Sequence, residues 1–443
     1  MNEKTSLKNT FVTGFALFAM FLGAGNLIFP PYIGIRAGNL YFVALLGFLF
    51  TGILMPLLGL LSTSKIGGNL YDLSNVVSRR FSIIFNVLIL VSIGPLLAIP
   101  RTSATAFEVG VIPIFGDINL GKIFGIEIFR IIISALYFFI NLLFVLRPSK
   151  VIDAIGKYFT PVLLLLLISL IVKGIISPIG VPGEPSVSSP FTIGFKEGYQ
   201  TMDALASMAF AGIAVSSIRK RYSDEKIVWN ESIKSSVIAA VGLLIVYGGF
   251  IYLGATGSIV FKDIDRTQAT VKLVRAIGSE AGKVALSISM TVACLTTSIG
   301  LITTIAEFFK QLTKNKFSYK NIVYIVTAIS FIISIFGVNQ IIYIAGPILS
   351  TLYPASIVLI ILNLFRKHIN RRGLFRGAVI GATLIGIFYG IESVLPHTFI
   401  VENILYKLPL GKDGFFWIIT AIIGGIIGYM VDKSPLPELK KVL

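Results

Sequence analysis

The sequence predicts an all-α polytopic membrane protein with about twelve transmembrane helices. Of its 443 residues, 55% are hydrophobic and 13% are charged, whereas roughly 25% are charged in an ordinary soluble domain. A second observation is that apolar runs of roughly 20 residues, enough to cross a hydrocarbon core of about 30 Å, recur between short charged connectors. Residues 1–443 are therefore expected to form a single integral membrane domain.

The expected spans end where apolar runs meet charges or clusters of Pro and Gly. Their boundaries are expected to be accurate to about two to four residues. They lie near residues 10–35, 40–62, 82–104, 126–146, 152–176, 192–217, 233–256, 282–308, 320–337, 339–364, 374–395 and 413–431.

A linker rich in Pro, Gly and Ser, from Ser177 to Pro190, separates the fifth expected span from the sixth. It divides the first ten spans into residues 10–176 and 192–364. Because five is odd, corresponding spans in the two halves cross the membrane in opposite directions, which is the arrangement of a 5+5 inverted repeat. Residues 374–431 are left as two additional helices.

The formal net charge of +17 is an orientation signal in this chain and does not point to nucleic acid. Basic residues gather in alternate connectors, as in the run Arg219-Lys220-Arg221, so the positive-inside rule places both termini in the cytoplasm. The main exception is an expected outer loop from about Gly257 to Lys283, and long loops weigh less in this rule.

Motifs of enzymes and of metal sites are absent from the sequence. There is no GxxxxGK[ST] phosphate loop, and the single cysteine, Cys294, excludes a disulfide framework. The chain is therefore expected not to be an enzyme and to need no cofactor.

The first span is expected to break at Gly23-Ala24-Gly25-Asn26, roughly 20 Å into the membrane at 1.5 Å per residue. A helix that opens at that depth must line a cavity or a ligand site. Freed N–H groups would face an anion, freed carbonyls a cation, and the Asn26 side chain could ligate a cation or cap the next half-helix. The alternative is that the small residues let another helix pack closely.

Asp203 lies deep in the sixth span. This span occupies the same place in the second half of the repeat as the first span does in the first half. A carboxylate at that depth is costly, so it is a candidate partner for a cation, a proton or a substrate amine. The alternative is a protonated or purely structural aspartate.

Two further clusters are candidates for lesser roles. Hydroxyl groups of Thr296 and Thr297 in the eighth span could complete an alkali-cation shell, although such hydroxyls usually bond their own helix. Arg101 and Glu108, near the end of the third span, are candidate gate residues or else an interfacial pair that anchors the helix end.

Several strings in order resemble bacterial branched-chain amino acid carriers of the BrnQ type, over nearly the whole chain. The first is Gly14-Phe15-Ala16-Leu17-Phe18 followed by Gly23-Ala24-Gly25-Asn26-Leu27-Ile28-Phe29-Pro30-Pro31. Others are Gly94-Pro95-Leu96 with Pro100-Arg101-Thr102, Phe107-Glu108-Val109-Gly110, Gly198-Tyr199 with Thr201-Met202-Asp203, and Ala306-Glu307-Phe308-Phe309.

The resemblance implies a LeuT-type fold of five plus five inverted helices, here with two extra spans. It implies symport of leucine, isoleucine and valine across a bacterial plasma membrane, driven by sodium or protons. The substrate would bind at Gly23, Ala24, Gly25, Thr201, Met202 and Asp203. By the same resemblance, Na⁺ would bind at Ala19, Leu22, Asn26, Ala293, Thr296 and Thr297.

One departure leaves the ion open, because Asp203 does not simply match the uncharged sixth-span pocket of the best-known LeuT-type relative. A proton could thus replace one of the sodium ions. Two other functions are kept as alternatives: a carrier of another small solute on the same fold, and a channel or sensor, for which symmetric pore motifs would be expected.

Overall fold

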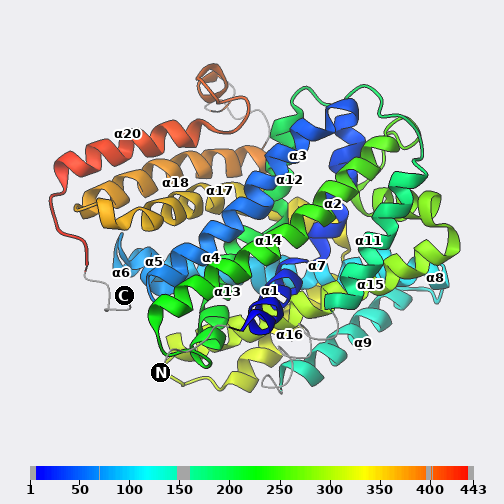
Figure 1. Cartoon of the computed structure of the whole chain (residues 1–443), viewed down its shortest axis with the longest axis horizontal. Coiled ribbons are helices and arrows are strands. Elements are labelled where there is room, and N and C mark those ends of the chain that lie inside the picture. Colours follow the sequence, from blue (N-terminus) through cyan, green and yellow to red (C-terminus); the bar gives the residue numbers. More distant parts are fainter. Residues whose placement is uncertain (1–5, 69, 147–159, 396–400, 402, 438–443) are drawn as a thin grey trace.

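The computed structural model describes residues 6–68, 70–146, 160–395, 401 and 403–437, and these are mostly helical (Figure 1). A short hairpin departs from the all-α expectation: β1 (Lys122–Ile123) pairs antiparallel with β2 (Ile126–Glu127). It lies in a connector, so it leaves the fold class unchanged.

The first two expected spans are each divided into shorter helices. The first comprises α1 (Leu7–Phe21) and α2 (Ala24–Ala37). After η1 (Gly38–Leu40), the second comprises α3 (Tyr41–Leu49), the π-turn η2 (Phe50–Leu54) and α4 (Met55–Lys65), and α5 (Leu70–Asn75) follows.

The third expected span, 82–104, is too short. The helical path runs through α6 (Arg79–Val91), η3 (Ser92–Leu96), α7 (Ala98–Thr105), η4 (Ala106–Val111) and α8 (Ile112–Phe115). The path kinks at Gly94 inside η3, where φ is −93° and ψ is −118°, and helical turns resume at Ala98 and run through η4 to Phe115. Arg101 therefore lies in the interior of this span rather than at its end.

The remaining helices follow the expected order, with one large difference. The 47-residue α15 begins at Arg266, so most of the expected loop from Gly257 to Lys283 is helical. The side chain of Asp265 caps its first turn by accepting the N–H of Gln268. The bounds are α9 (Ile128–Val145), α11 (Thr160–Ile176), α12 (Pro190–Thr201), α13 (Asp203–Arg219), α14 (Glu225–Thr256), α15 (Arg266–Leu312), α16 (Tyr319–Ser334), α17 (Val338–Leu364), η7 (Arg366–His368), α18 (Arg372–Val394), η8 (Leu405–Lys407) and α20 (Phe416–Val431). The start of the expected fifth span, 152–159, lies outside the described residues.

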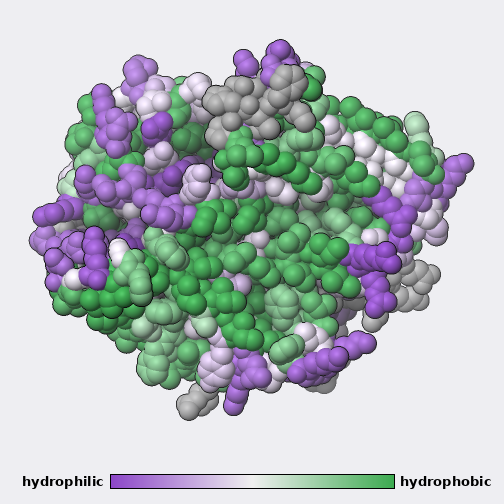
Figure 2. Space-filling view, turned by 180° about the vertical axis from the view of Figure 1, so that it is seen from behind, coloured by the Kyte–Doolittle hydropathy of each residue, from purple (hydrophilic) through white to green (hydrophobic). Residues whose placement is uncertain are grey.

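Eight helical stretches within the described residues are long and apolar enough to cross a membrane. Four shorter apolar helices accompany them: Leu7–Phe21, Thr160–Ile176, Tyr319–Ser334 and Phe416–Val431. Figure 2 shows hydrophobic side chains across the broad middle of one face, with hydrophilic ones mostly toward its margins. This surface suits a protein surrounded by lipid, and the number of twelve spans stays a prediction.

Glycines allow two pairs of helices to approach through their backbones. A Cβ atom on Gly34 of α2 would lie 2.0 Å from the carbonyl oxygen of Ile251 in α14, and this contact holds α14 against the broken first span. A Cβ atom on Gly377 of α18 would lie 1.8 Å from the carbonyl oxygen of Gly424 in α20. With α17, these last two helices form a layer on one side of the molecule (Figure 1).

Candidate functional site

The first span breaks one residue earlier than expected, at Leu22 and Gly23. Leu22 has φ −72° and ψ 82°, and Gly23 has φ −105° and ψ −164°, whereas α2 begins at Ala24. The Asn26 side-chain oxygen explains the shift, because it accepts the Gly23 N–H at 3.0 Å and caps α2. Ala24 and Gly25 thus lie in the first turn, where N–H groups have no partner within the helix.

The sixth span also breaks, at Met202. α12 ends at Thr201 and α13 begins at Asp203, with Met202 between them at φ 66° and ψ 9°. This left-handed conformation is uncommon for a residue other than glycine. The sequence singled out Asp203 by its charge, but Met202 carries no local signal for a break.

Asn26, Asp203 and Tyr247 connect the two breaks. The Asn26 amide donates to an Asp203 carboxylate oxygen at 2.5 Å and to the Tyr247 hydroxyl, which in turn donates to the same carboxylate oxygen at 3.4 Å. All three side chains are buried, with exposures of 4% or less. Sequence reasoning missed Tyr247 in α14, because tyrosines scattered through membrane spans are more often packing or interface residues.

Arg101 is also buried, at 3% exposure, and it binds the end of α12. Its Nη1 donates to the carbonyl of Gln200 at 2.5 Å and its Nη2 to that of Thr201 at 3.3 Å. These are carbonyls of a helix C-terminus, which carries partial negative charge. The guanidinium also lies 5.4 Å from the ring centre of Phe29, and its Nε has no partner in the described part of the chain.

Arg101 does not pair with Glu108, so the two candidate gate residues are not brought together. Glu108 instead accepts from Arg130 of α9 at 2.9 Å and from the N–H of Val338 at the start of α17 at 3.1 Å. Arg101 therefore joins the third span to the sixth without Glu108.

Four of the expected ion-site residues do meet between α1 and α15. The Thr296 hydroxyl lies 3.4 Å from the Ala19 carbonyl and 3.0 Å from the Ala293 carbonyl. The Thr297 hydroxyl lies 3.5 Å from the Ala19 carbonyl and 3.4 Å from that of Met20. Among the described contacts, neither hydroxyl bonds the Leu22 carbonyl. Hydroxyl and carbonyl oxygens from two helices thus converge, as hard-cation ligands do.

The cavity between the two breaks is small, about 20 Å³, which is room for about one water molecule. It is lined by polar groups of both breaks and by an apolar wall made of Met20, Phe21, Ile93, Ala98, Phe210 and Leu301. Leucine does not fit in this conformation, so binding requires the wall or the breaks to move.

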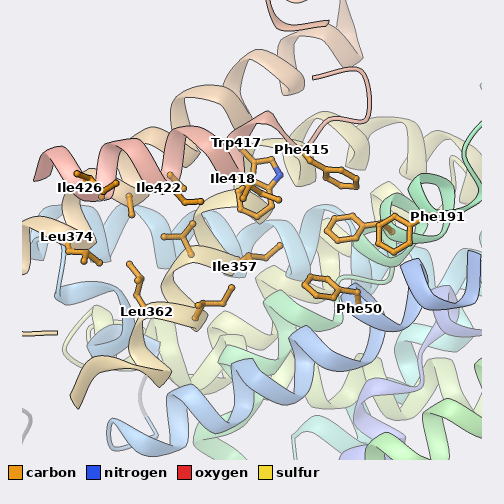
Figure 3. Close-up of a pocket in the computed structure, with 16 residues that line it drawn as sticks. Phe50, Phe191, Ile357, Leu362, Leu374, Phe415, Trp417, Ile418, Ile422 and Ile426 are labelled. Atoms are coloured by element: carbon orange, nitrogen blue, oxygen red, sulfur yellow. The ribbon is translucent and has the colours of Figure 1, made fainter. Parts of the chain in front are cut away.

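A much larger cavity of about 620 Å³ lies between α12, α17, α18 and α20 (Figure 3). Its lining is aliphatic and aromatic, from Phe50 and Phe191 to Ile357, Leu374 and Ile422. An amino acid carries two charges that this surface cannot solvate. The smaller central cavity is therefore the better candidate for a substrate site.

Comparison with known families supplies the decisive observation. Residues 6–434 match the family described as branched-chain amino acid transport protein. The chain belongs to this family. The branched-chain amino acid permease BraB of Bacillus subtilis is 37% identical over 455 residues, covering 100% of both chains. The branched-chain amino acid transport system 2 carrier protein of Pseudomonas aeruginosa is 37% identical over 426 residues, covering 95% of each.

Solved structures confirm the fold of this family member. A Na⁺-coupled sialic acid symporter superposes with a TM-score of 0.62 at 14% identity, covering 97% of this chain and 91% of the other. The predicted LeuT-type fold is thereby confirmed. Membership in a family of transport proteins also confirms that the chain is a multi-pass carrier and not an enzyme.

Proposed function

We propose that this chain is a secondary active symporter that takes up leucine, isoleucine and valine with Na⁺ or H⁺ through alternating access. The observation that carries the proposal is the pair of broken helices, joined by Asn26, Asp203 and Tyr247 around one cavity. Family membership supports the choice of substrate. The bacterial relatives support a plasma membrane location, and the basic connectors support cytoplasmic termini.

The substrate carboxylate would bind the open N–H groups of the first break. Gly23 and Ala24 line the central cavity, Gly25 follows them in the first turn of α2, and the N-terminus of α2 carries partial positive charge. Arg101 adds a full positive charge near this turn, since a Cβ atom on Gly25 would lie 2.9 Å from its Nη2. An anion in the cavity would thus meet a guanidinium as well as backbone N–H groups.

The substrate ammonium would bind the sixth-span break on the opposite side of the cavity. Thr201, Met202 and Asp203 line it there. The Asp203 carboxylate is suited to a cation, and the carbonyls at the end of α12, which bind Arg101 here, would become available when those bonds break. The remaining wall is apolar, and discrimination by apolar contacts is about 1 to 3 kcal/mol per methylene. All three branched-chain amino acids should therefore be accepted.

Two features bear on the coupling ion, and they favour different ions. The oxygens of Ala19, Ala293, Thr296 and Thr297 favour Na⁺, as does the sodium coupling named for the sialic acid symporter. Asp203 is a buried carboxylate able to carry a proton. Asn26 serves as a helix cap in this conformation, so its use as a sodium ligand would require that cap to open.

Arg101 also makes contacts that would have to break and re-form during alternating access. Its two bonds fasten the third span to the end of α12 beside the closed cavity. Access from the outer side would require these bonds to break. Arg101 would thus act as a latch, meaning a contact that keeps the cavity closed, and Glu108 would take no part in it.

Leucine uptake into proteoliposomes tests the proposal. The purified chain is reconstituted, and radiolabelled leucine uptake is measured with an inward Na⁺ gradient, with an inward H⁺ gradient and with neither. One of the two gradients should drive accumulation, and valine and isoleucine should compete whereas alanine should not. Uptake that ignores both gradients would refute symport, and failure of valine and isoleucine to compete would refute the substrate class.

A further inference from the structure

A second cavity with a mixed lining lies on the far side of the α12 terminus from the central cavity. It has a volume of about 470 Å³ and is bounded by α12, α17, α18 and the segment that leads into α20. Trp417 and Phe415, both labelled in Figure 3, line this cavity as well as the apolar one beside it. We call it the lateral cavity.

Three polar groups that line the lateral cavity are buried and have no hydrogen-bond partner among the described residues. They are the side-chain carbonyl oxygen of Gln200, the hydroxyl of Tyr199 and the indole N–H of Trp417, of which the last two lie close to each other without a hydrogen bond of good geometry. Buried polar atoms are nearly always paired in folded proteins, so a cluster of unpaired ones marks a place for a polar ligand. The cluster offers both donors and an acceptor.

The lateral cavity also carries one charge of each sign. Lys196 of α12 and Glu392 of α18 both line it. The Lys196 ammonium lies beside Gly414, 3.5 Å from where a Cβ atom on that glycine would stand. Leu349 and Pro354 of α17 and the ring of Phe415 supply apolar walls. A small zwitterion with an apolar side chain satisfies all of these features together.

The end of α12 connects the lateral cavity to the central one. Gln200 points its unpaired side-chain oxygen to the lateral cavity, while its backbone carbonyl accepts from Arg101 of the central cavity. The ring of Tyr199 stacks on that of Tyr353 with centroids 4.1 Å apart. A ligand that bonds the Gln200 side chain would therefore contact a residue whose backbone carbonyl binds Arg101.

We propose that the lateral cavity is a second binding site for a branched-chain amino acid. The ligand carboxylate lies near Lys196, its ammonium near Glu392, and its polar atoms bond Gln200, Tyr199 and Trp417. This inference rests on the proposed function, because it takes the transported substrate as the ligand.

Tryptophan fluorescence of the full chain reports on this site directly. The sequence contains two tryptophans, Trp229 and Trp417, so Trp229→Phe leaves Trp417 as the single reporter inside the lateral cavity. The purified Trp229→Phe protein is titrated with leucine, and its leucine uptake in proteoliposomes is measured in parallel. Equilibrium dialysis with radiolabelled leucine counts the sites per chain.

Two further variants in the Trp229→Phe background separate the cavities. Gln200→Leu removes the side-chain acceptor but keeps the backbone carbonyl that Arg101 binds, and Asp203→Asn alters the central cavity. A saturable Trp417 response is expected, which persists in Asp203→Asn and needs at least tenfold more leucine in Gln200→Leu. Dialysis should count two leucines per chain in the parent and one in each variant.

The proposal is overturned if leucine leaves Trp417 fluorescence unchanged, or if Asp203→Asn abolishes the response and Gln200→Leu does not. A dialysis count of one in the parent would overturn it as well. Loss of gradient-driven uptake while dialysis still counts two bound leucines would instead count against the proposed function and leave the lateral site in place. The two failures are therefore distinguishable.

Discussion

The two helix breaks face the same cavity but are built in opposite ways. The first uses Gly23 and is capped by Asn26, three residues away, so its geometry is specified locally. The second places Met202 in a left-handed conformation, which costs roughly 1 to 2 kcal/mol for a residue with a side chain. It is held by Arg101, which reaches the end of α12 from about a hundred positions earlier in the chain.

This difference assigns different tasks to the two breaks. The first break has no charged side chain and offers open backbone, so it is suited to hold one part of the substrate in a fixed place. The second carries Asp203 and depends on Arg101, so its shape changes whenever those bonds change. We therefore expect the first break to determine binding and the second to determine coupling and movement.

The largest effect is expected for Asp203→Asn. It removes the charge that accepts bonds from Asn26 and Tyr247. Hydrogen bonds to charged groups contribute about 1.5 to 3 kcal/mol each, so two of them predict a loss of leucine uptake of about 100-fold or more. Uptake into proteoliposomes at equal protein content measures it.

Glu231→Gln is the matched control, because Glu231 is equally buried but bonds Thr10 and Lys234 away from both breaks. Its uptake should stay within about fivefold of wild type, since the two bonds that it weakens lie away from both breaks and Lys234 is half exposed. Equal losses of leucine uptake in the two variants would show that the second break has no special role.

Arg101→Lys is expected to have the second largest effect. A lysine places one point charge where the guanidinium fork reached two carbonyls, so a carbonyl of Gln200 or Thr201 loses its donor. An unsatisfied buried group costs about 1 to 3 kcal/mol, which predicts about 30-fold slower uptake. Arg130→Lys, at the partly exposed pair with Glu108, should change uptake less than about threefold. The reverse ranking would contradict the latch.

Gly25→Ala tests the open backbone of the first break. The new Cβ atom would lie 2.9 Å from Arg101 Nη2 and 2.8 Å from the Phe29 ring. Overpacking costs about 1 to 3 kcal/mol, so KM for leucine should rise about tenfold with kcat changed less. Gly300→Ala in α15 is the control, since its nearest neighbour would be 3.7 Å away. A larger fall in kcat than rise in KM would assign movement to the first break too.

Thr297→Ala should have the smallest effect on uptake, and it tests whether Na⁺ binds near this residue. It removes a hydroxyl that lies near the carbonyls of Ala19 and Met20. One neutral polar contact contributes about 0.5 to 1.5 kcal/mol, so the Na⁺ concentration for half-maximal uptake should rise about threefold to tenfold. Thr297→Ser keeps the hydroxyl and should resemble wild type. Identical sodium curves for all three proteins would exclude a sodium site at this position.

Features that depend on local chemistry were predictable from the sequence. Glycines beside an asparagine at mid-span predicted the first break to within a residue, and the cost of a buried charge singled out Asp203. The convergence of Ala19, Ala293, Thr296 and Thr297 followed from the family resemblance, because no local pattern brings α1 next to α15.

Features that depend on distant contacts were not predictable. The third span is predicted to end near residue 104, yet helical turns continue to Phe115, and Arg101, a candidate interfacial residue, is buried. The break at Met202 depends on neighbours from another span, and so does the role of Tyr247. These contacts join residues of different spans, so no single stretch of the sequence indicates them.

The backbone contact between Gly377 and Gly424 has a mechanical consequence. Helices that touch without intervening side chains cannot slide past one another without a clash, so α18 and α20 form a stiff double rod. A disulfide or other crosslink within this rod should leave transport intact, while one from the rod to α12 should arrest it. The two added helices would then be a rigid support packed against α17, relative to which α12 moves during transport.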